Sequence, residues 1–196
     1  MQITPLKLDG VLLIAPQRHG DERGWFSETF RASALAEAGF DRPFVQDNHA
    51  RSTTRGILRG LHFQKPPAEQ DKLIRTVRGS IFDVAVDIRQ GSPTYGQWVG
   101  AELSADNGHQ LLVPAGFAHG YCTLSEECEV LYKVTQYYTP SAEGALNWDD
   151  PAVGIEWPLP KTEIRTNARD GAAPVLADFK TPFVLDPKPQ VLAPQI

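Results

Sequence analysis

Two tyrosines on one run of residues have the spacing to hold a long ligand. Residues 130–138 read as a strand, on which successive side chains point to opposite faces, so Tyr132 and Tyr138 share a face. They are six residues apart, roughly 20 Å along a strand, too far to touch one small ring. A phenol can transfer a proton and an aromatic face can stack on a planar base, so a nucleotide-linked sugar would suit both tyrosines. The alternative is a half-buried strand with ordinary aromatics.

A histidine follows a proline and a glycine at a spacing suited to a turn. The pattern Gly108-x5-Pro114-x-Gly116-x2-His119 predicts a turn that delivers His119 from a strand start into a barrel. It resembles the second sequence motif of the cupin superfamily. That resemblance implies an all-β fold, a cupin-type jelly roll or double-stranded β-helix, with a few short helices.

A second histidine lies in a pattern that departs from the first cupin motif at one position. Gly56-x5-His62-x-Gln64-x4-Glu69 has Gln64 where a metal-binding histidine would stand. A neutral amide is a poor ligand for a transition metal beside imidazole, so we expect a barrel without a metal. A metal site of His62, Glu69 and His119 is the alternative.

The wider sequence is similar to one metal-free cupin family, the dTDP-4-dehydrorhamnose 3,5-epimerases. The resemblance extends from near the N-terminus to about Asp178. The matching segments occur in order along the chain: 21–24, 45–49, 56–64, 72–73, 82–89, 114–120 and 131–133. It implies an isomerase of dTDP-L-rhamnose synthesis that inverts two carbons of a keto sugar without a cofactor.

The family implies a set of catalytic residues that suits this chemistry. His62 would be the general base, Asp170 its orienting carboxylate and Tyr132 the general acid. A histidine near pKa 6.5 is suited to accept a proton at neutral pH, whereas a tyrosine near 10 stays protonated. Lys72 would stabilise negative charge on the ketone oxygen. Asp170 has a solvated turn aspartate as its alternative, because Arg169 before it stands where the family has lysine.

Ligand anchoring is also implied by the resemblance. Guanidinium groups bind phosphate oxygens in pairs, and Arg23, Arg59 and Arg169 match pyrophosphate-binding positions. Tyr138 matches the aromatic that stacks on thymine, and His119 would line the same pocket. The remaining substrate-contacting positions match Glu28, Gln46, Asp47, Asn48 and Glu143.

One geometric difficulty follows from strand periodicity. Arg59 and His62 have opposite parity and would face opposite sides of an ideal strand. Both can line one pocket only if the backbone bulges, and we expect the bulge at Gly60.

The elements that must hold these residues are mostly short β-rich runs, typical of a sandwich or barrel. In residues 81–88 alternate apolar side chains predict one face in a dry core, with Asp83 and Asp87 on the other. A helix is expected at 34–38, with Ser33 as N-cap and Gly39 ending it. Turns are expected at 78–80 and 125–127. The expected strands are 11–15, 25–30, 57–64, 73–77, 81–88, 98–103, 110–113, 120–124 and 130–138.

Composition limits the remaining possibilities. The 196 residues fit a single domain, 1–196, in which 171–196 form a proline-rich extension expected to lie on the surface or on a partner subunit. Hydrophobic residues make up 41% and charged ones 22%, which is ordinary globular composition. The net charge of −5 disfavours nucleic acid or anionic membranes as partners.

Location and thiol state follow from two further observations. The apolar run at 11–15 is too short to span a bilayer and lacks the signature of a secretory signal, so we expect a cytoplasmic protein. Cys122 and Cys128, the two cysteines, are expected to be reduced, with a bridge across a turn as the alternative.

The hypothesis is a homodimeric, metal-free epimerase acting at two carbons. Three alternatives remain: an epimerase that acts at one carbon in an antibiotic deoxysugar pathway, a metal-dependent cupin enzyme, and a sugar-nucleotide binder without activity. The dimer is implied by the family, whose subunits exchange N-terminal strand contacts.

Overall fold

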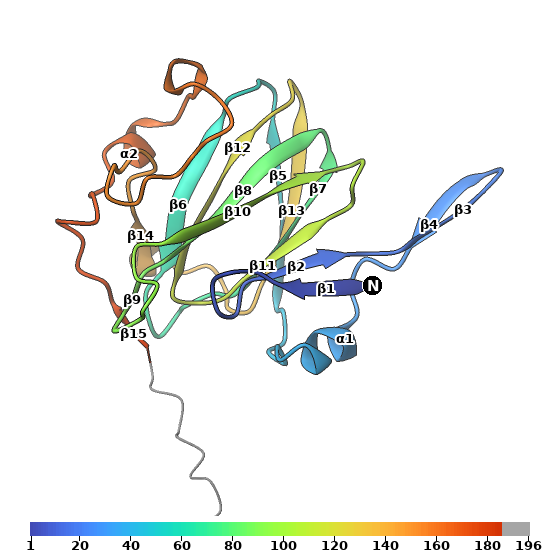
Figure 1. Cartoon of the computed structure of the whole chain (residues 1–196), viewed down its shortest axis with the longest axis horizontal. Helices are drawn as coiled ribbons and strands as arrows, with labels where there is room; N and C mark the ends of the chain where they lie inside the picture. The colour runs from blue at the N-terminus through green and yellow to red at the C-terminus, as the bar shows by residue number, and fades with distance from the viewer. Residues whose placement is uncertain (186–196) are drawn as a thin grey trace, which may run out of the picture.

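Two antiparallel sheets face each other and form the predicted jelly roll (Figure 1). The computed structural model describes residues 1–185. One sheet has the strand order β1-β2-β11-β7-β13-β5 and the other β10-β8-β12-β6-β14. Their bounds are β1 Gln2–Pro5, β2 Leu12–Ala15, β5 Gln46–Ser52, β6 Leu58–Gln64, β7 Lys72–Arg78, β8 Ser80–Asp87, β10 Trp98–Ser104, β11 Gln110–Val113, β12 Phe117–Thr123, β13 Cys128–Val134 and β14 Glu143–Ala145.

Smaller elements lie around the two sheets. Two pairs of short strands are separate from them, one antiparallel and one parallel. The helices are all short, as predicted. Their bounds are β3 Arg18–Asp21, β4 Gly24–Ser27, β9 Arg89–Gln90, β15 Phe183–Val184, α1 Ala32–Glu37, α2 Ala168–Gly171, η1 Pro140–Ala142 and η2 Lys161–Glu163.

The core between the sheets is built from the inward-facing residue of each alternating pair. Ile74 of β7 and Val130 of β13 meet Ile81 and Ala85 of β8 and Phe117 of β12, all buried. Both predicted turns are present, between β7 and β8 and between β12 and β13. Burying this apolar surface drives the sheets together. Cys122 and Cys128 are buried free thiols, as expected.

The face of β8 that was predicted to lie in a dry core packs against the C-terminal segment. Val84 and Val86 on this face belong to one hydrophobic cluster with Phe183, and Trp157 packs against that cluster. The other face, which carries Asp83, is inside the barrel and is fully buried as well. The predicted dry face is therefore confirmed, and the fold buries the opposite face as well.

The C-terminal segment lies along the surface of the barrel as far as residue 185 and is attached there at Phe183 and β15. Phe183 is only 7% exposed, and β15 pairs with β9 in parallel. An apolar side chain this well buried offsets the entropy of ordering the segment. Pro187, Pro189 and Pro194 lie outside the described residues.

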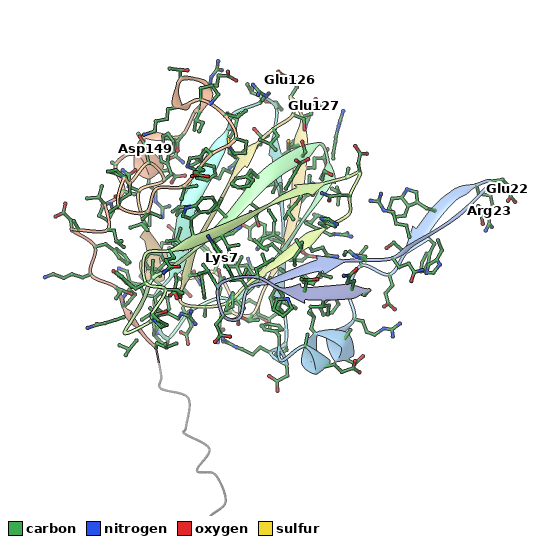
Figure 2. The ribbon with its side chains drawn as sticks, viewed as in Figure 1. Lys7, Glu22, Arg23, Glu126, Glu127 and Asp149 are labelled. Carbon is green, nitrogen blue, oxygen red and sulfur yellow. The ribbon has the colours of Figure 1, made fainter. Side chains whose placement is uncertain are left out.

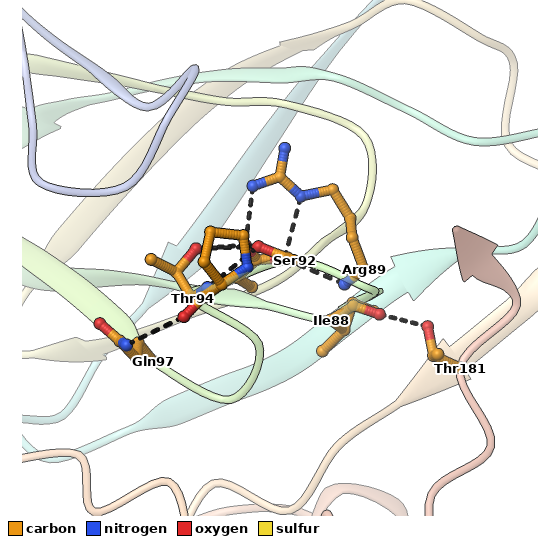
Figure 3. A network of polar contacts seen from close by, with 8 residues as sticks. Ile88, Arg89, Ser92, Thr94, Gln97 and Thr181 are labelled. Carbon is orange, nitrogen blue, oxygen red and sulfur yellow. Dashed lines mark hydrogen bonds and ion pairs between the residues drawn. The ribbon is translucent and has the colours of Figure 1, made fainter. Parts of the chain in front are cut away.

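A polar network closes the loop that follows β8 (Figure 3). The buried carboxylate of Asp87 accepts hydrogen bonds from the Arg89 guanidinium at 2.9 and 2.7 Å and from the hydroxyls of Ser92 and Thr94 at 2.6 and 2.7 Å. The hydroxyl of Thr181 donates to the Ile88 carbonyl and so attaches the C-terminal segment to the same loop. The buried charge is thus paired and hydrogen-bonded, as burial requires.

The run at 130–138 is not one strand. Strand β13 ends at Val134, and the carbonyls of Gln136 and Tyr137 accept hydrogen bonds from the side-chain amides of Gln70 and Gln64 instead of a neighbouring strand. The prediction that Tyr132 and Tyr138 lie on one strand, 20 Å apart along it, was therefore wrong.

The helix is displaced from its predicted position by two residues at its start. Arg31 is the N-cap of α1 and makes no side-chain cap bond, so Ser33 lies inside the helix. Gly39, with φ +95°, follows the helix end in the left-handed conformation that favours glycine. Buried Leu35 anchors α1 to the outer face of the six-stranded sheet. None of the helices within 1–185 is long and apolar enough to cross a membrane.

The β3–β4 hairpin projects away from the barrel (Figures 1 and 2). Trp25 is 60% and Phe26 72% exposed on it, and Arg23 lies at its tip. Large exposed aromatics on a projecting element are typical of an interaction surface.

Candidate active site

A cavity of about 240 Å³ opens inside the barrel between the two sheets. Strands β6 and β12 contribute one wall, whereas β7 and β13 contribute the other. Helix α2 closes one side. The polar residues that line it are Arg59, His62, Lys72, His119, Tyr121, Tyr132, Asn167 and Asp170.

A second cavity of about 240 Å³ continues from the first. Both are lined by His62, Lys72 and Tyr132. The second is also lined by Gln46, Asn48, Gln64, Gln70, Tyr138 and Glu143. Because the two cavities share these three lining residues, they are adjacent and can hold one elongated ligand. Tyr138 reaches this site from the segment after β13.

His62 and Asp170 form the central pair of the first cavity. His62 Nε2 lies 2.8 Å from Asp170 Oδ1, and Asp170 is only 1% exposed. The other carboxylate oxygen accepts the Gly60 backbone N–H at 3.1 Å, and the Asn167 side chain caps α2 at the Asp170 N–H. With Nε2 donating to the carboxylate, the lone pair of neutral His62 is at Nδ1.

Burial lowers the pKa of His62, and Asp170 opposes this effect. The positive charges of Lys72 and Arg169 lower it slightly further. His62 therefore stays neutral down to a lower pH than a free imidazole, and a neutral imidazole is the form that accepts a proton.

The predicted bulge at Gly60 is confirmed. Arg59 pairs with Tyr121 and His62 pairs with His119. Between these two pairs β6 advances by three residues and β12 by two, so β6 contains one extra residue. The extra residue brings both Arg59 and His62 to the cavity. Gly60 has φ +142°, and a Cβ there would lie 2.5 Å from the Gly120 Cα, so only glycine fits.

Lys72 and Tyr132 face His62 from the other sheet. The Lys72 ammonium donates to the His62 carbonyl at 3.3 Å. Burial lowers its pKa to about 8, opposed by the charges of Asp83 and Glu143. Burial raises the pKa of Tyr132, and Arg59 opposes this, so the phenol remains a proton donor at neutral pH.

His119 enters the cavity wall where the Pro114 and Gly116 pattern predicted, from the start of β12. Its Nε2 lies 2.7 Å from Asp83 Oδ1, and both side chains are buried. Sequence reasoning missed Asp83 as part of the site, although a charged residue inside the apolar run 81–88 was the available signal. It also missed Tyr121 and Asn167, for which no signal was present.

The predicted ligand-binding residues gather mainly at the second cavity. Gln46 donates to Asn48 at 2.8 Å and accepts the Tyr138 backbone N–H at 3.0 Å. Glu143 pairs with Arg169 at 2.7 Å, which places that guanidinium beside the second cavity.

Three predicted residues are not brought to either cavity by their own chain. The side chain of Asp47 points to the outer face of β5 and pairs with Lys133 at 3.0 Å, because it alternates with inward-facing Gln46 and Asn48. Arg23 binds Asp21 on the projecting hairpin, and Glu28 pairs with exposed Arg31 at 2.9 Å.

The residues around Gln64 do not fit a metal site. Its amide donates to the carbonyls of Ala68 and Tyr137 and accepts the Thr139 N–H at 2.7 Å, so both ends are already used. Glu69 lines neither cavity. Across residues 1–185 no three His, Cys, Asp or Glu side chains form a group that could hold a metal ion.

The fold and the site define a cupin-type jelly-roll enzyme whose cavity is lined by groups that can accept and donate protons. The family model described as dTDP-4-dehydrorhamnose 3,5-epimerase matches residues 5–178. The chain belongs to this family of isomerases.

Three relatives illustrate the match. The dTDP-4-dehydrorhamnose 3,5-epimerase of Salmonella typhimurium is 50% identical over 177 residues, 90% of this chain and 96% of that protein. The 3,5-epimerase of Legionella pneumophila, in complex with dTDP-4-keto-L-rhamnose, has a TM-score of 0.86 at 44% identity and covers 91% of this chain and 94% of its own. The dTDP-4-dehydrorhamnose 3-epimerase of Streptomyces niveus is 34% identical over 200 residues and covers 96% of each chain.

Proposed function

We propose that this chain inverts carbons three and five of dTDP-4-dehydro-6-deoxy-D-glucose and yields dTDP-4-dehydro-L-rhamnose, in dTDP-L-rhamnose biosynthesis. One observation carries the proposal. The imidazole of His62 and the phenol of Tyr132 line the same cavity from opposite sheets. Inversion beside a ketone needs a base on one face of the sugar and an acid on the other.

Each inversion is a transfer of two protons. The neutral His62 Nδ1 takes the proton from the carbon beside the ketone, and the electron pair of that C–H bond moves to the ketone oxygen to give an enolate. The Tyr132 hydroxyl then gives its proton to the same carbon from the opposite face. Before the second inversion the charged imidazole releases its proton to solvent and the phenolate takes one up, which restores both groups. The Asp170 carboxylate orients the imidazole and stabilises its charged form. The product is an isomer of the substrate, so the reaction needs no redox cofactor.

Lys72 and His119 would face the ketone side of the sugar. The Lys72 ammonium lies against the His62 strand and lines both cavities. A fixed positive charge in an enclosed site stabilises a developing enolate oxygen by several kcal/mol. His119 lines the first cavity beside it.

The nucleotide would occupy the second cavity. Tyr138 offers an aromatic face for the base, with Gln46, Asn48 and Glu143 as polar contacts. Arg59 lines the first cavity and Arg169 flanks the second, so both guanidinium groups can reach a pyrophosphate between base and sugar.

The active form would be a homodimer in the cytoplasm. The β3–β4 hairpin carries Arg23 away from its own barrel and exposes Trp25 and Phe26. A twofold exchange of hairpins would cover these aromatics and bring Arg23 and Glu28 to the partner's site. The Asp47 side chain would remain on the outer face of its sheet.

Turnover in heavy water tests the number of carbons inverted. Proton donation from exchangeable groups would place deuterium at both carbons three and five. Deuterium at carbon three alone would favour a 3-epimerase, the activity named for the Streptomyces niveus relative, and would overturn the double inversion.

A second experiment separates an enzyme from a binding protein. His62→Ala should abolish turnover and leave dTDP affinity nearly intact, because the contacts proposed for the base and the pyrophosphate are made by other residues. A variant with full turnover would remove His62 as the base.

A further inference from the structure

The barrel interior carries two rows of paired residues that cross three neighbouring strands, and every member except Ala85 is polar. His62, His119 and Ala85 form one row, because His119 of β12 pairs with both of the others. Arg59, Tyr121 and Asp83 form the next row in the same way. Directly paired residues have Cβ atoms about 5 Å apart. Asp83 therefore lies beside Tyr121 and diagonally next to His119 on the inner face of the sheet.

Asp83 is the buried acid of this array. It is 0% exposed, and its Oδ1 lies 2.7 Å from His119 Nε2. Its Oδ2 and the Tyr121 hydroxyl are both buried without a hydrogen-bond partner among the described residues. A carboxylate held with one hydrogen bond is costly to bury, so its charge must be compensated by nearby cations.

His119 and Lys72 are the groups placed to compensate it. Asp83 occupies the Nε2 side of His119, which leaves Nδ1 as the nitrogen available to a ligand. The small side chain of Ala85 lies opposite His119 and leaves room for this orientation. Asp83 also acts through its charge on Lys72, where it is the strongest influence that favours the ammonium form.

We propose that Asp83 is a positioning residue for the epimerisation, which orients His119 and places a buried negative charge in the barrel wall that faces Lys72. The proposal rests on the function proposed above. Asp83 and His119 are thus a second carboxylate–imidazole pair, one strand away from Asp170 and His62. The first pair removes the proton and the second supports the side of the site where negative charge develops.

The proposal predicts the direction in which the Lys72 pKa shifts when the Asp83 charge is removed. Burial lowers the Lys72 pKa to about 8, and Asp83 limits that fall. Without the Asp83 charge the ammonium would lose its proton at a lower pH. The other ionisable groups that line the two cavities with Lys72 are Arg59, His62, His119, Tyr121, Tyr132, Tyr138, Glu143 and Asp170.

The variant Asp83→Asn tests the proposal, because it removes the charge at almost constant shape. We expect kcat at pH 7 to fall about 10-fold or more with KM nearly unchanged, and the loss of activity at high pH to begin at a lower pH. NMR titration of labelled lysine without substrate should show Lys72 losing its proton at lower pH. Wild-type kcat, or a Lys72 titration that does not move, would overturn the proposal.

Asp87→Asn is the matched control. Asp87 is also fully buried on β8, but its partners are Arg89, Ser92 and Thr94 in the loop after the strand. It should lower thermal stability and leave the Lys72 titration as in the wild type. An equal shift in Asp87→Asn would mean that any lost buried charge has this effect, and would overturn the assignment.

A second variant keeps the test valid if Asp83→Asn does not fold. His119→Gln retains the Asp83 charge, so the Lys72 titration should stay at or above its wild-type position while kcat falls. A titration that moves to lower pH would overturn the proposal. The NMR readout needs no turnover, so failure of the proposed reaction would appear separately, as an absence of deuterium exchange in the wild type.

Discussion

His62 Nε2 lies 2.8 Å from Asp170 Oδ1, although 108 positions separate the two residues in the chain. The contact depends on two local features. Gly60 shifts the register of β6 so that His62 faces inward, and Asn167 caps the short helix that presents Asp170. Burial of the pair then sets the protonation state of His62.

The pair predicts how activity varies at acidic pH. Burial keeps the His62 pKa below 6.5, so kcat/KM should fall only as the pH drops through that lowered value and the imidazole becomes charged. Asp170→Asn removes the group that raises the pKa. The acidic limb should then move to lower pH while kcat falls about 100-fold or more. A pH–rate profile checks this, and a limb that moves to higher pH would contradict it.

Lys72 predicts the behaviour at alkaline pH. Its pKa of about 8 means that kcat should decline above pH 8 as the ammonium is lost, whereas burial keeps Tyr132 protonated beyond its usual range. Lys72→Met should lower kcat about 100-fold and abolish this decline. Lys72→Arg is the control, because a guanidinium keeps its charge and should move the decline to higher pH. A Met variant that keeps the wild-type decline would assign it to another group.

Tyr132 predicts a separation of the two proton transfers. Tyr132→Phe removes the donor opposite His62 but leaves the base and Asp170 in place. Substrate labelled with deuterium at carbons three and five should therefore still lose label to water, while formation of the inverted product falls about 100-fold. Mass spectrometry follows the label, and an unchanged yield of product would remove Tyr132 as the acid.

Sequence reasoning was most reliable where a local rule decided the structure. The family resemblance assigned both Arg59 and His62 to one pocket, and strand periodicity then placed a bulge at Gly60. The same alternation along β5 specifies that Asp47 faces outward when Gln46 and Asn48 face inward. The sequence therefore contained enough information to exclude Asp47 from the cavity.

Long-range pairing accounts for what the sequence could not predict. The contact between Asp83 and His119 exists because β8 and β12 are neighbours, and no local pattern specifies that. Tyr138 does not lie on the predicted strand, because the side chains of Gln64 and Gln70 bind the backbone carbonyls of the two residues before it. Both glutamines are more than sixty positions away in the chain. The family resemblance supplied Asp170, whose local sequence also suits a surface turn.

Gly60 predicts that one methyl group disrupts the site. In Gly60→Ala the new Cβ would lie 2.5 Å from the Gly120 Cα in a backbone conformation that L residues rarely adopt. We expect a loss of about 3 kcal/mol or more in the free energy of unfolding, measured with urea. Gly20→Ala is the control, since its Cβ would meet only ordinary contact at 3.6 Å. Equal stability of the two variants would show that β6 tolerates a different register.

The projecting hairpin predicts complementation between two inactive variants. His62→Ala damages the barrel site and Arg23→Ala damages the hairpin, so each homodimer should be nearly inactive. If each hairpin serves the partner's barrel, a mixed dimer has one site with both defects and one site with neither. After the two proteins are unfolded and refolded together, half of the dimers should be mixed and about a quarter of wild-type activity should return. If each hairpin serves its own barrel, every site carries one defect and no activity returns, which would overturn the exchange of hairpins.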